Sequence, residues 1–131
     1  LVPSQLLLRC WHSLIMRSLM FEVIMLDSTQ YCMVLTTVNS ESIKKDLLAA
    51  ILERKLAACI QTIPIHSHYM WEGKVCEDSE QLLILKTEIR LYSEIEKCIT
   101  DLHNYDVPQI VQVPFINGFD PYLTWISKNV D

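Results

Sequence analysis

Hydrophobic and polar residues follow two different periods along residues 31–130, and each period predicts one kind of element. Short runs rich in β-branched and aromatic residues predict strands. Apolar residues spaced three or four positions apart predict helices with one buried face. In chain order the pattern predicts a strand, a helix, two strands, a second helix, a further strand and a closing helix.

The first strand and helix lie between Tyr31 and Leu56. The sequence YCMVLTTV predicts the strand, and Asn39 or Ser40 after it can cap the helix. The predicted apolar face of this helix comprises Ile43, Leu47, Leu48, Ile51, Leu52 and Leu56. The sequence ACIQTI then predicts a second strand, which we expect to end at Pro64.

A hairpin is predicted in the middle of the chain. The sequence HSHYMWE continues the extended pattern as far as Gly73. Gly73-Lys74, together with the acidic pair Glu77-Asp78, predicts the turn. The sequence EQLLILKT then forms a nearly continuous apolar strand, which is expected where both faces of a sheet are covered.

The second half of the chain predicts two more helices and a strand. The apolar positions of the first of these helices are Leu91, Ile95, Cys98, Ile99 and Leu102. Pro108 follows that helix, and QIVQVPF predicts the next strand. Asp120-Pro121 combines a capping side chain with a proline at the first helical position. Tyr122, Trp125 and Ile126 form the predicted apolar face of the closing helix.

This order predicts an α+β fold. Two βαβ halves with right-handed crossovers, joined by a hairpin, form a ferredoxin-like split βαβ sheet with helices on one face. The other face is then bare, and the hairpin strands through Trp71 and Leu82 extend past the sheet. Uncovered apolar surface and unpaired strand edges are usually resolved by association, so we expect a homo-oligomer.

Composition narrows the class of protein. The chain has 131 residues and a mass of 15.2 kDa, which fit one domain, and half of its residues are apolar. Its net charge of −5 argues against a nucleic-acid partner, which would require a basic face. No run of 18 uncharged apolar residues occurs, so we expect no membrane partner.

The five cysteines are an odd number and include no CxxC pair. This pattern favours reduced thiols in a cytosolic protein over a disulfide framework or a structural zinc site. The cysteines are Cys10, Cys32, Cys59, Cys76 and Cys98.

Residues 1–26 differ from the rest. They contain Arg9 and Arg17 but no acidic residue before Glu22, and the first residue is leucine. We expect a leader or an expression-derived segment outside the fold, and a folded domain over residues 27–131.

Several short motifs together resemble the CutA divalent-cation tolerance family over roughly residues 31 to 130. They are ERKLAAC (Glu53 to Cys59), WEGK (Trp71 to Lys74), EDSE (Glu77 to Glu80), LKT (Leu85 to Thr87) and YLTW (Tyr122 to Trp125). The resemblance implies a ferredoxin-like homotrimer, similar in architecture to the PII signalling proteins, whose long hairpins pair between subunits. It also implies a role in tolerance of copper and other divalent ions, with no established enzymatic reaction.

Several positions depart from the pattern of this family. The chain has His103-Asn104-Tyr105 where His-Pro-Tyr is usual. Gln109 stands where a glutamate is common, which removes one carboxylate that could act as a ligand or an acid. His68 occupies a position that is usually apolar.

Two sets of residues are candidate metal ligands. His66 and His68 are two positions apart on a strand, so both imidazoles share one face and could chelate copper or zinc; the alternative is a pair of partly exposed hairpin histidines. The resemblance implies a metal role for Cys98, His103 and Cys59, whose thiolate and imidazole donors suit copper. Cys98 also fits as a small hydrophobe in the apolar face of its helix.

A third set of residues is a candidate ligand cleft between subunits of such a trimer. It comprises Trp71, Lys86, Tyr105, Gln109 and Trp125. Aromatic walls with a lysine and an amide could hold a small anion or metabolite. The alternative is that both tryptophans pack at an interface, Tyr105 bonds the backbone and Lys86 pairs with an acid.

Sequence signatures of catalysis are absent: the chain has no GxSxG, no glycine-rich phosphate loop and no HExxH. Together with what the resemblance implies, this leads us to expect a cytoplasmic, non-enzymatic divalent metal ion (copper) tolerance protein. It would bind copper or another divalent cation weakly or transiently as a homotrimer, with no obligatory cofactor. The alternative function is a PII-like small-molecule sensor or a signalling scaffold.

Overall fold

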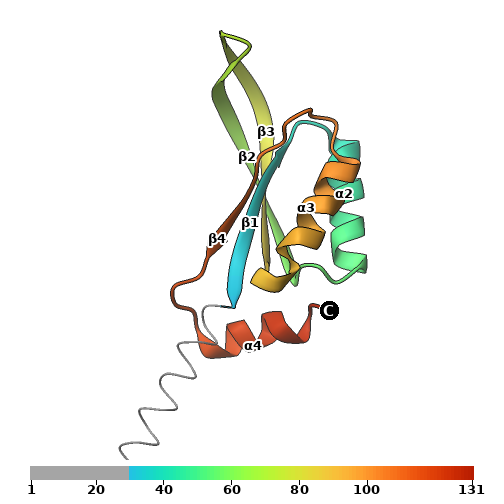
Figure 1. Cartoon of the computed structure of the whole chain (residues 1–131), viewed down its shortest axis with the longest axis vertical. Helices are drawn as coiled ribbons and strands as arrows, with labels where there is room; N and C mark the ends of the chain where they lie inside the picture. The colour runs from blue at the N-terminus through green and yellow to red at the C-terminus, as the bar shows by residue number, and fades with distance from the viewer. Residues whose placement is uncertain (1–29) are drawn as a thin grey trace, which may run out of the picture.

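The computed structural model describes residues 30–131, so the predicted leader, residues 1–26, lies outside the described part of the chain. Figure 1 shows a sheet with two helices along one side and a third helix below its end. In chain order the elements are β1 (Tyr31–Val38), α2 (Glu41–Glu53), β2 (Cys59–Trp71), β3 (Lys74–Glu88), the short 3₁₀ turn η1 (Ile89–Leu91), α3 (Tyr92–Leu102), β4 (Ile110–Pro114) and α4 (Asp120–Lys128).

The four strands form one antiparallel sheet in the order β2-β3-β1-β4. The first strand is therefore central: Val34 lies opposite Leu85 of β3 on one side and Gln112 of β4 on the other. This is the strand order of the ferredoxin-like α+β fold, and it confirms the prediction from the element pattern.

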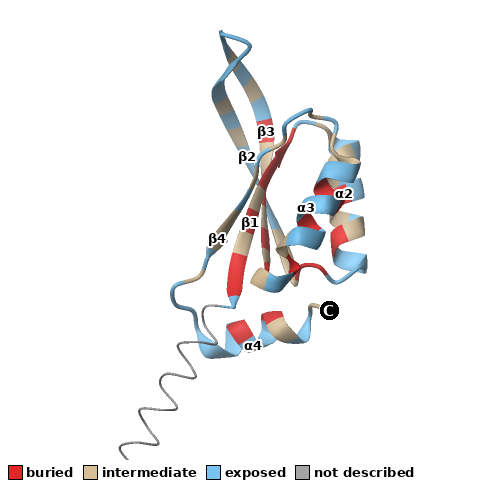
Figure 2. Ribbon diagram, in the orientation of Figure 1, coloured by how far each residue is buried: buried red, intermediate tan, exposed pale blue. Residues whose placement is uncertain are grey.

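The main core lies between α2, α3 and one face of the sheet. Its most buried apolar side chains are Val34, Val38, Leu47, Ile51, Leu83, Leu85, Ile95 and Ile99. Figure 2 shows buried segments of α2, α3 and the strands. Ser40 caps α2 as predicted, because its side chain accepts a hydrogen bond from the backbone N–H of Ile43. Leu52 is 44% exposed, so its predicted place on the buried face was wrong.

The opposite face of the sheet carries a row of apolar residues that no helix of the described chain covers (Figure 1). We call this the open face, and its residues are Leu35, Ile63, Leu82, Ile84 and Val111. Ile63 and Val111 are both 46% exposed. Side chains alternate across a strand, so these residues face away from the core residues Val34, Leu83 and Leu85.

The hairpin differs from its prediction at two places. β2 does not end at Pro64, which pairs with Gln81 inside a continuous strand. Proline is tolerated there because β2 is an edge strand. The turn consists of Glu72 and Gly73, both with positive φ as a tight two-residue hairpin turn requires, so Glu77-Asp78 belongs to β3 rather than to the turn.

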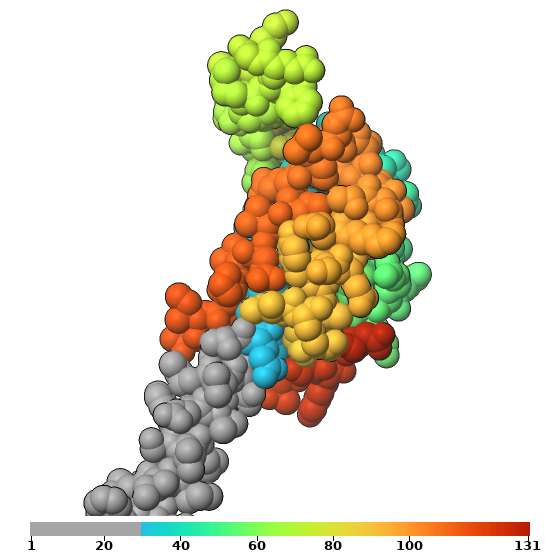
Figure 3. Space-filling model, in the orientation of Figure 1, coloured from blue at the N-terminus to red at the C-terminus, as the bar shows by residue number. Residues whose placement is uncertain are grey.

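The outer half of the hairpin, residues 65–80, projects beyond both long helices, and we call it the arm. Figure 3 shows its tip standing clear of the body. The tip exposes large apolar side chains, with Val75 at 78% and Met70 at 64%. Such a surface is costly in water unless another group covers it.

Helix α4 closes the lower end of the sheet. Leu123 and Ile126 are buried against Tyr31, whose hydroxyl bonds Ser127 at 2.5 Å. Tyr122 and Trp125, which we predicted on the buried face beside Ile126, are exposed instead. Asp120 is the first residue of the helix, and Phe119 occupies the cap position without a side-chain bond, so the predicted aspartate cap was wrong by one residue.

Within residues 30–131, the structure contains no helix with the length and apolar character needed to cross a membrane.

Candidate functional site

The two candidate cysteine ligands lie on opposite faces of the sheet. Cys98 of α3 is 4% exposed and belongs to the core. Cys59, at the start of β2, lies opposite Lys86, one position along β3 from the core residue Leu85, and so is on the other face. In the part of the chain that the structure describes, no group of three or more His, Cys, Asp or Glu side chains is placed to hold a metal ion.

His103 uses both ring nitrogens within the fold. The backbone N–H of Tyr105 donates to Nδ1 at 3.1 Å, which places the ring proton on Nε2. Nε2 lies 2.8 Å from the carbonyl oxygen of Thr37 and donates to it. The side chain therefore fastens the end of α3 to β1, and a metal ion would have to break one of these bonds to reach a lone pair.

His66 and His68 share one face of the arm, as their spacing predicts. They lie opposite Ser79 and Glu77 of β3. Nδ1 of His66 is 3.2 Å from the Ser79 hydroxyl, and Nε2 of His68 is 4.0 Å from a carboxylate oxygen of Glu77. The side chains of His68 and Glu77 are 63% and 68% exposed, so an ion in solution can reach both.

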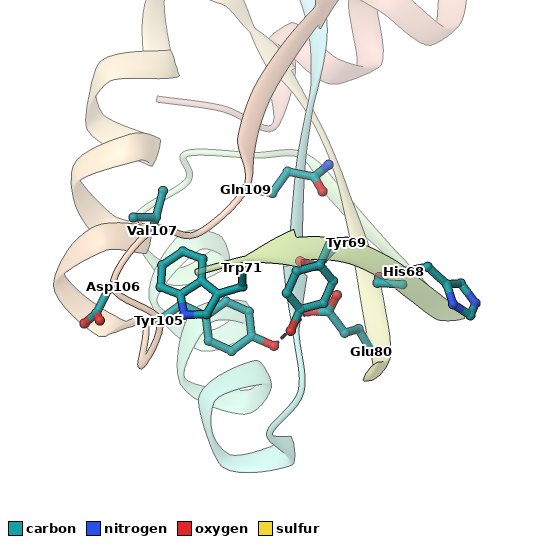
Figure 4. Close-up of a pocket in the computed structure, with 10 residues that line it drawn as sticks. His68, Tyr69, Trp71, Glu80, Tyr105, Asp106, Val107 and Gln109 are labelled. Atoms are coloured by element: carbon teal, nitrogen blue, oxygen red, sulfur yellow. Dashed lines mark hydrogen bonds between the residues drawn. The ribbon is translucent and has the colours of Figure 1, made fainter. Parts of the chain in front are cut away.

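A pocket of about 520 Å³ lies between the arm and the loop that joins α3 to β4. It is lined by Thr37, Ser67, His68, Tyr69, Trp71, Glu80, Tyr105, Asp106, Val107 and Gln109. Three of the residues predicted for a ligand cleft, Trp71, Tyr105 and Gln109, are thus brought together. A single chain supplies all of these walls, whereas the prediction placed the cleft between subunits. Figure 4 shows the imidazole of His68 directed away from the aromatic side chains.

The other two residues predicted for this cleft lie elsewhere. Lys86 is near the far end of β3, where its ammonium group donates to the side-chain oxygen of Gln61 at 2.7 Å. A strand rises about 3.3 Å per residue, so roughly 20 Å of β3 separates Lys86 from Glu80 of the pocket. Trp125 stacks on Tyr122 of α4, with ring centroids 5.9 Å apart. The predicted combination of aromatic walls with a lysine is therefore not formed within one chain.

Carboxylates and tyrosines dominate the polar chemistry of the pocket. Glu80 is only 9% exposed, and its Oε2 accepts a hydrogen bond of 2.7 Å from the Tyr105 hydroxyl. Burial, followed by this bond to Glu80, raises the pKa of Tyr105 above its ordinary value. The bond that Tyr69 donates to Asp78 raises the pKa of Tyr69 to about 12. Both phenols therefore remain neutral at physiological pH.

Sequence reasoning missed Tyr69, Asp78, Glu80 and Asp106 as members of this site. Asp78 was placed in a turn, which concealed that Asp78 and Glu80 occupy alternate positions of one strand. The register that pairs Tyr69 with Cys76 puts the tyrosine on the same face as both carboxylates. A correct turn assignment at Glu72-Gly73 would have revealed this arrangement.

Comparison with known proteins supports the resemblance seen in the motifs. The family model described as CutA1 divalent ion tolerance protein matches residues 32–129. Protein CutA, chloroplastic, of Arabidopsis thaliana is 41% identical over 97 residues, which are 73% of this chain and 53% of that protein. The divalent-cation tolerance protein CutA of Thermus thermophilus is 39% identical over 97 residues, which are 73% of this chain and 94% of that protein. The matched part of this chain thus spans about half of the plant relative.

Solved structures agree with the sequence comparison. The crystal structure of CutA1 from Oryza sativa has a TM-score of 0.75 and 36% identity, covering 80% of this chain and 97% of that one. The structure of the divalent cation tolerance protein from Thermus thermophilus has a TM-score of 0.74 and 37% identity, covering 77% of this chain and 99% of that one. The fold and the sequence match agree over nearly all of the described residues, and the chain belongs to the CutA1 divalent ion tolerance family.

Proposed function

We propose that this protein acts in tolerance of divalent cations, with copper first among them, as a cytoplasmic homotrimer that contacts metal ions weakly or transiently. The observation that carries the proposal is the family match over residues 32–129. Relatives named for divalent-cation tolerance support it. The proposed role needs no catalytic step and no resident cofactor. The names of the relatives give no support to a small-molecule sensor or scaffold as the main function.

Assembly follows from the two apolar surfaces that one chain leaves uncovered. The open face and the tip of the arm expose Ile63, Val111 and Val75. The outer edges of β2 and β4 have no partner strand within the described sheet. If each chain buried about 1,000 Å² of mostly apolar surface, the gross gain would be on the order of 25 kcal/mol before the costs of association. The number of three subunits follows from the resemblance to the family.

The exposed histidines of the arm are the donors that we propose for copper. Imidazole and carboxylate are suitable ligands for Cu(II), and His66, His68 and Glu77 present both types to solvent. Two donors on a projecting arm make a weak site, which fits transient contact. Cys98 and His103 are less accessible, because the first is buried and the second is held by two hydrogen bonds.

A copper titration of metal-stripped, tag-free protein by calorimetry tests this function. We expect weak, saturable binding that is lost when His66→Ala and His68→Ala are combined. Cys98→Ser is the control and should leave binding unchanged. Copper binding that survives the double histidine variant but disappears with Cys98→Ser would place the site at α3 instead. A complete absence of binding to the wild-type protein would refute direct metal contact.

Growth of Escherichia coli lacking its own CutA protein tests the role in cells. We expect expression of this chain to restore growth on elevated copper, and the double histidine variant to restore it less well. Equal growth with and without the chain would contradict the proposed function.

A further inference from the structure

The pocket between the arm and the loop after α3 has three aromatic walls. Tyr69 and Trp71 extend from β2, and Tyr105 extends from the loop. Figure 4 shows their rings gathered with Glu80, while Gln109 lies at the margin. A volume of about 520 Å³ is in the range of small-molecule sites, and the lining combines three aromatic rings with several polar side chains.

The charge of this pocket is negative. Glu80 and Asp106 line it, and Asp78 accepts the hydrogen bond from Tyr69 at its edge. None of its lining residues is lysine or arginine. The tyrosine hydroxyls donate to the carboxylates and add no positive charge. An anionic ligand would therefore meet repulsion here, in contrast to the anion that we expected from Lys86.

Glu80 is the least exposed acidic group of the pocket, and it accepts one hydrogen bond. Only 9% of its surface is exposed, and within residues 30–131 it forms no ion pair. Oε2 accepts the bond from Tyr105, and Oε1 has no hydrogen bond among the described residues. A buried carboxylate is costly unless an opposite charge or further hydrogen bonds compensate it. A cation bound in the pocket would compensate the charge of Glu80.

Aromatic rings determine which kind of cation fits. Ring faces attract ammonium and guanidinium groups, and substituted ammonium ions are recognised by aromatic cages because they are weakly hydrated. A bare divalent ion instead requires several oxygen, nitrogen or sulfur ligands, and no such cluster occurs in the described chain. We propose that this pocket binds a small organic cation, held by the rings of Tyr69, Trp71 and Tyr105 and neutralised by Glu80.

This site is separate from the proposed copper contacts. His66 and Glu77 lie on the opposite face of the arm, because side chains alternate along β2 and β3. His68 borders the pocket, but its imidazole is directed away from the aromatic rings (Figure 4). The two proposals can therefore fail independently. The double histidine variant tests copper binding without changing the aromatic rings or Glu80 of the pocket. The choline titrations, in turn, do not depend on copper binding.

Choline and its neutral isostere 3,3-dimethyl-1-butanol provide a matched pair of probes. The two differ by the charge on the central atom and are otherwise nearly the same shape. We expect the full-chain protein to bind choline saturably and at least about tenfold more tightly than the alcohol, with the indole N–H signal of Trp71 shifting in NMR titrations. Sodium chloride should match the ionic strength in both titrations, because salt screens exposed charge.

Two variants of the same strand locate the binding charge. Glu80→Gln removes the charge but keeps an oxygen to accept the Tyr105 hydroxyl, and we expect choline affinity to fall about tenfold. Glu77→Gln removes the same charge from the opposite face of β3 and should leave affinity unchanged. Trp71→Leu should also weaken choline binding. The fold should tolerate this substitution, because the side chain of Trp71 is exposed.

Three results would overturn the proposal. Equal affinity for choline and the neutral alcohol would show a merely apolar pocket. Equal losses in Glu80→Gln and Glu77→Gln would show attraction by net charge alone. Failure of choline to saturate the wild-type protein at tens of millimolar would show that the pocket is closed to such ligands, as it would be if a second copy of the chain filled it.

Discussion

His103 shows, at the scale of single residues, how a side chain suited to metal binding is used by the fold instead. The sequence placed it correctly at the end of a helix, where it is the residue that follows Leu102 of α3. Of its two hydrogen bonds, the one to Tyr105 is local, whereas the one to Thr37 joins residues 66 positions apart. Sequence periodicity does not predict such a long-range contact, so the sequence identified the residue but not its structural role.

Cys32 gives a prediction on pH at the same scale. It is fully buried in the central strand, and burial raises the pKa of its thiol from 9.0 to about 11. The unfolded thiol loses its proton at lower pH than the folded one, so folding stability should be complete below pH 9 and fall as pH rises towards 11. Thermal unfolding midpoints measured across this pH range would show the decline. For a domain of this size, each kcal/mol of unfolding free energy lost lowers the midpoint by roughly 4–8 °C.

Cys32→Ala separates this effect from the ionisation of tyrosines. The variant has a lower midpoint throughout, because it loses volume in the core. Its decline between pH 9 and 11 should nevertheless be shallower than that of the wild-type protein, while Cys76→Ala on the arm should keep the original slope. Parallel curves for Cys32→Ala and the wild type would contradict the assignment.

At the scale of elements, strong periodicity was the most reliable signal. The alternation and helical spacing of apolar residues predicted the order of strands and helices, and Ser40 was a correct helix cap. The predicted ends of elements were wrong where backbone conformation, rather than the pattern of hydrophobic residues, determines where a strand ends. Pro64 was taken to end a strand, but β2 is an edge strand, where the missing N–H costs little. That edge position is a property of the sheet and cannot be read from β2 alone.

The candidate pocket was predictable only in part for the same reason. Trp71, Tyr105 and Gln109 were chosen through a family resemblance, and the structure places them together. Glu80 was missed because its role depends on the register between β2 and β3, which the turn sets. A shift of the turn by two residues changes which side chains oppose each other along the entire arm.

The turn itself provides a test at this scale. Glu72 has φ of 50°, a conformation that asparagine adopts more readily than glutamate, and Gly73 follows it. Glu72→Asn should therefore stabilise the arm, by about 0.5 kcal/mol, without altering the body of the protein. Hydrogen exchange of backbone amides in residues 65–80 should slow by about twofold, while exchange in β1 should not change.

Glu77→Asn is the matched control, since it makes the same chemical change inside β3 rather than in the turn. It should leave exchange in the arm unchanged or slightly faster, because asparagine is disfavoured in strands. Faster exchange in Glu72→Asn would show that the glutamate conformation is not strained.

At the scale of the whole molecule, the open face is the surface through which we propose that the subunits associate. Ile63 is 46% exposed on this face, and Leu52 is 44% exposed on α2, on the other side of the sheet. The two residues are similar in size and exposure but differ in location. If the open face is the interface of the homotrimer, Ile63→Lys should separate the subunits, because it places a charge in a dry apolar contact.

Light scattering measures this difference directly. The wild-type protein and Leu52→Lys should each give three times the 15.2 kDa mass of the chain, whereas Ile63→Lys should shift towards the mass of one chain. A wild-type mass equal to one chain would refute the assembly. Dissociation of both variants alike would show that they act through general destabilisation.

The central position of β1 has a consequence for synthesis of the protein. This strand is the first element of the described chain, yet both of its neighbours, β3 and β4, are translated later. Its sequence YCMVLTTV contains no charged residue and is rich in β-forming side chains, which is typical of segments that aggregate when unpaired. At roughly 5–20 residues per second, a ribosome leaves this strand without a partner for a time on the order of seconds. Expression at lower temperature or with more chaperone should therefore raise the yield of native protein more than any change to the folded surface.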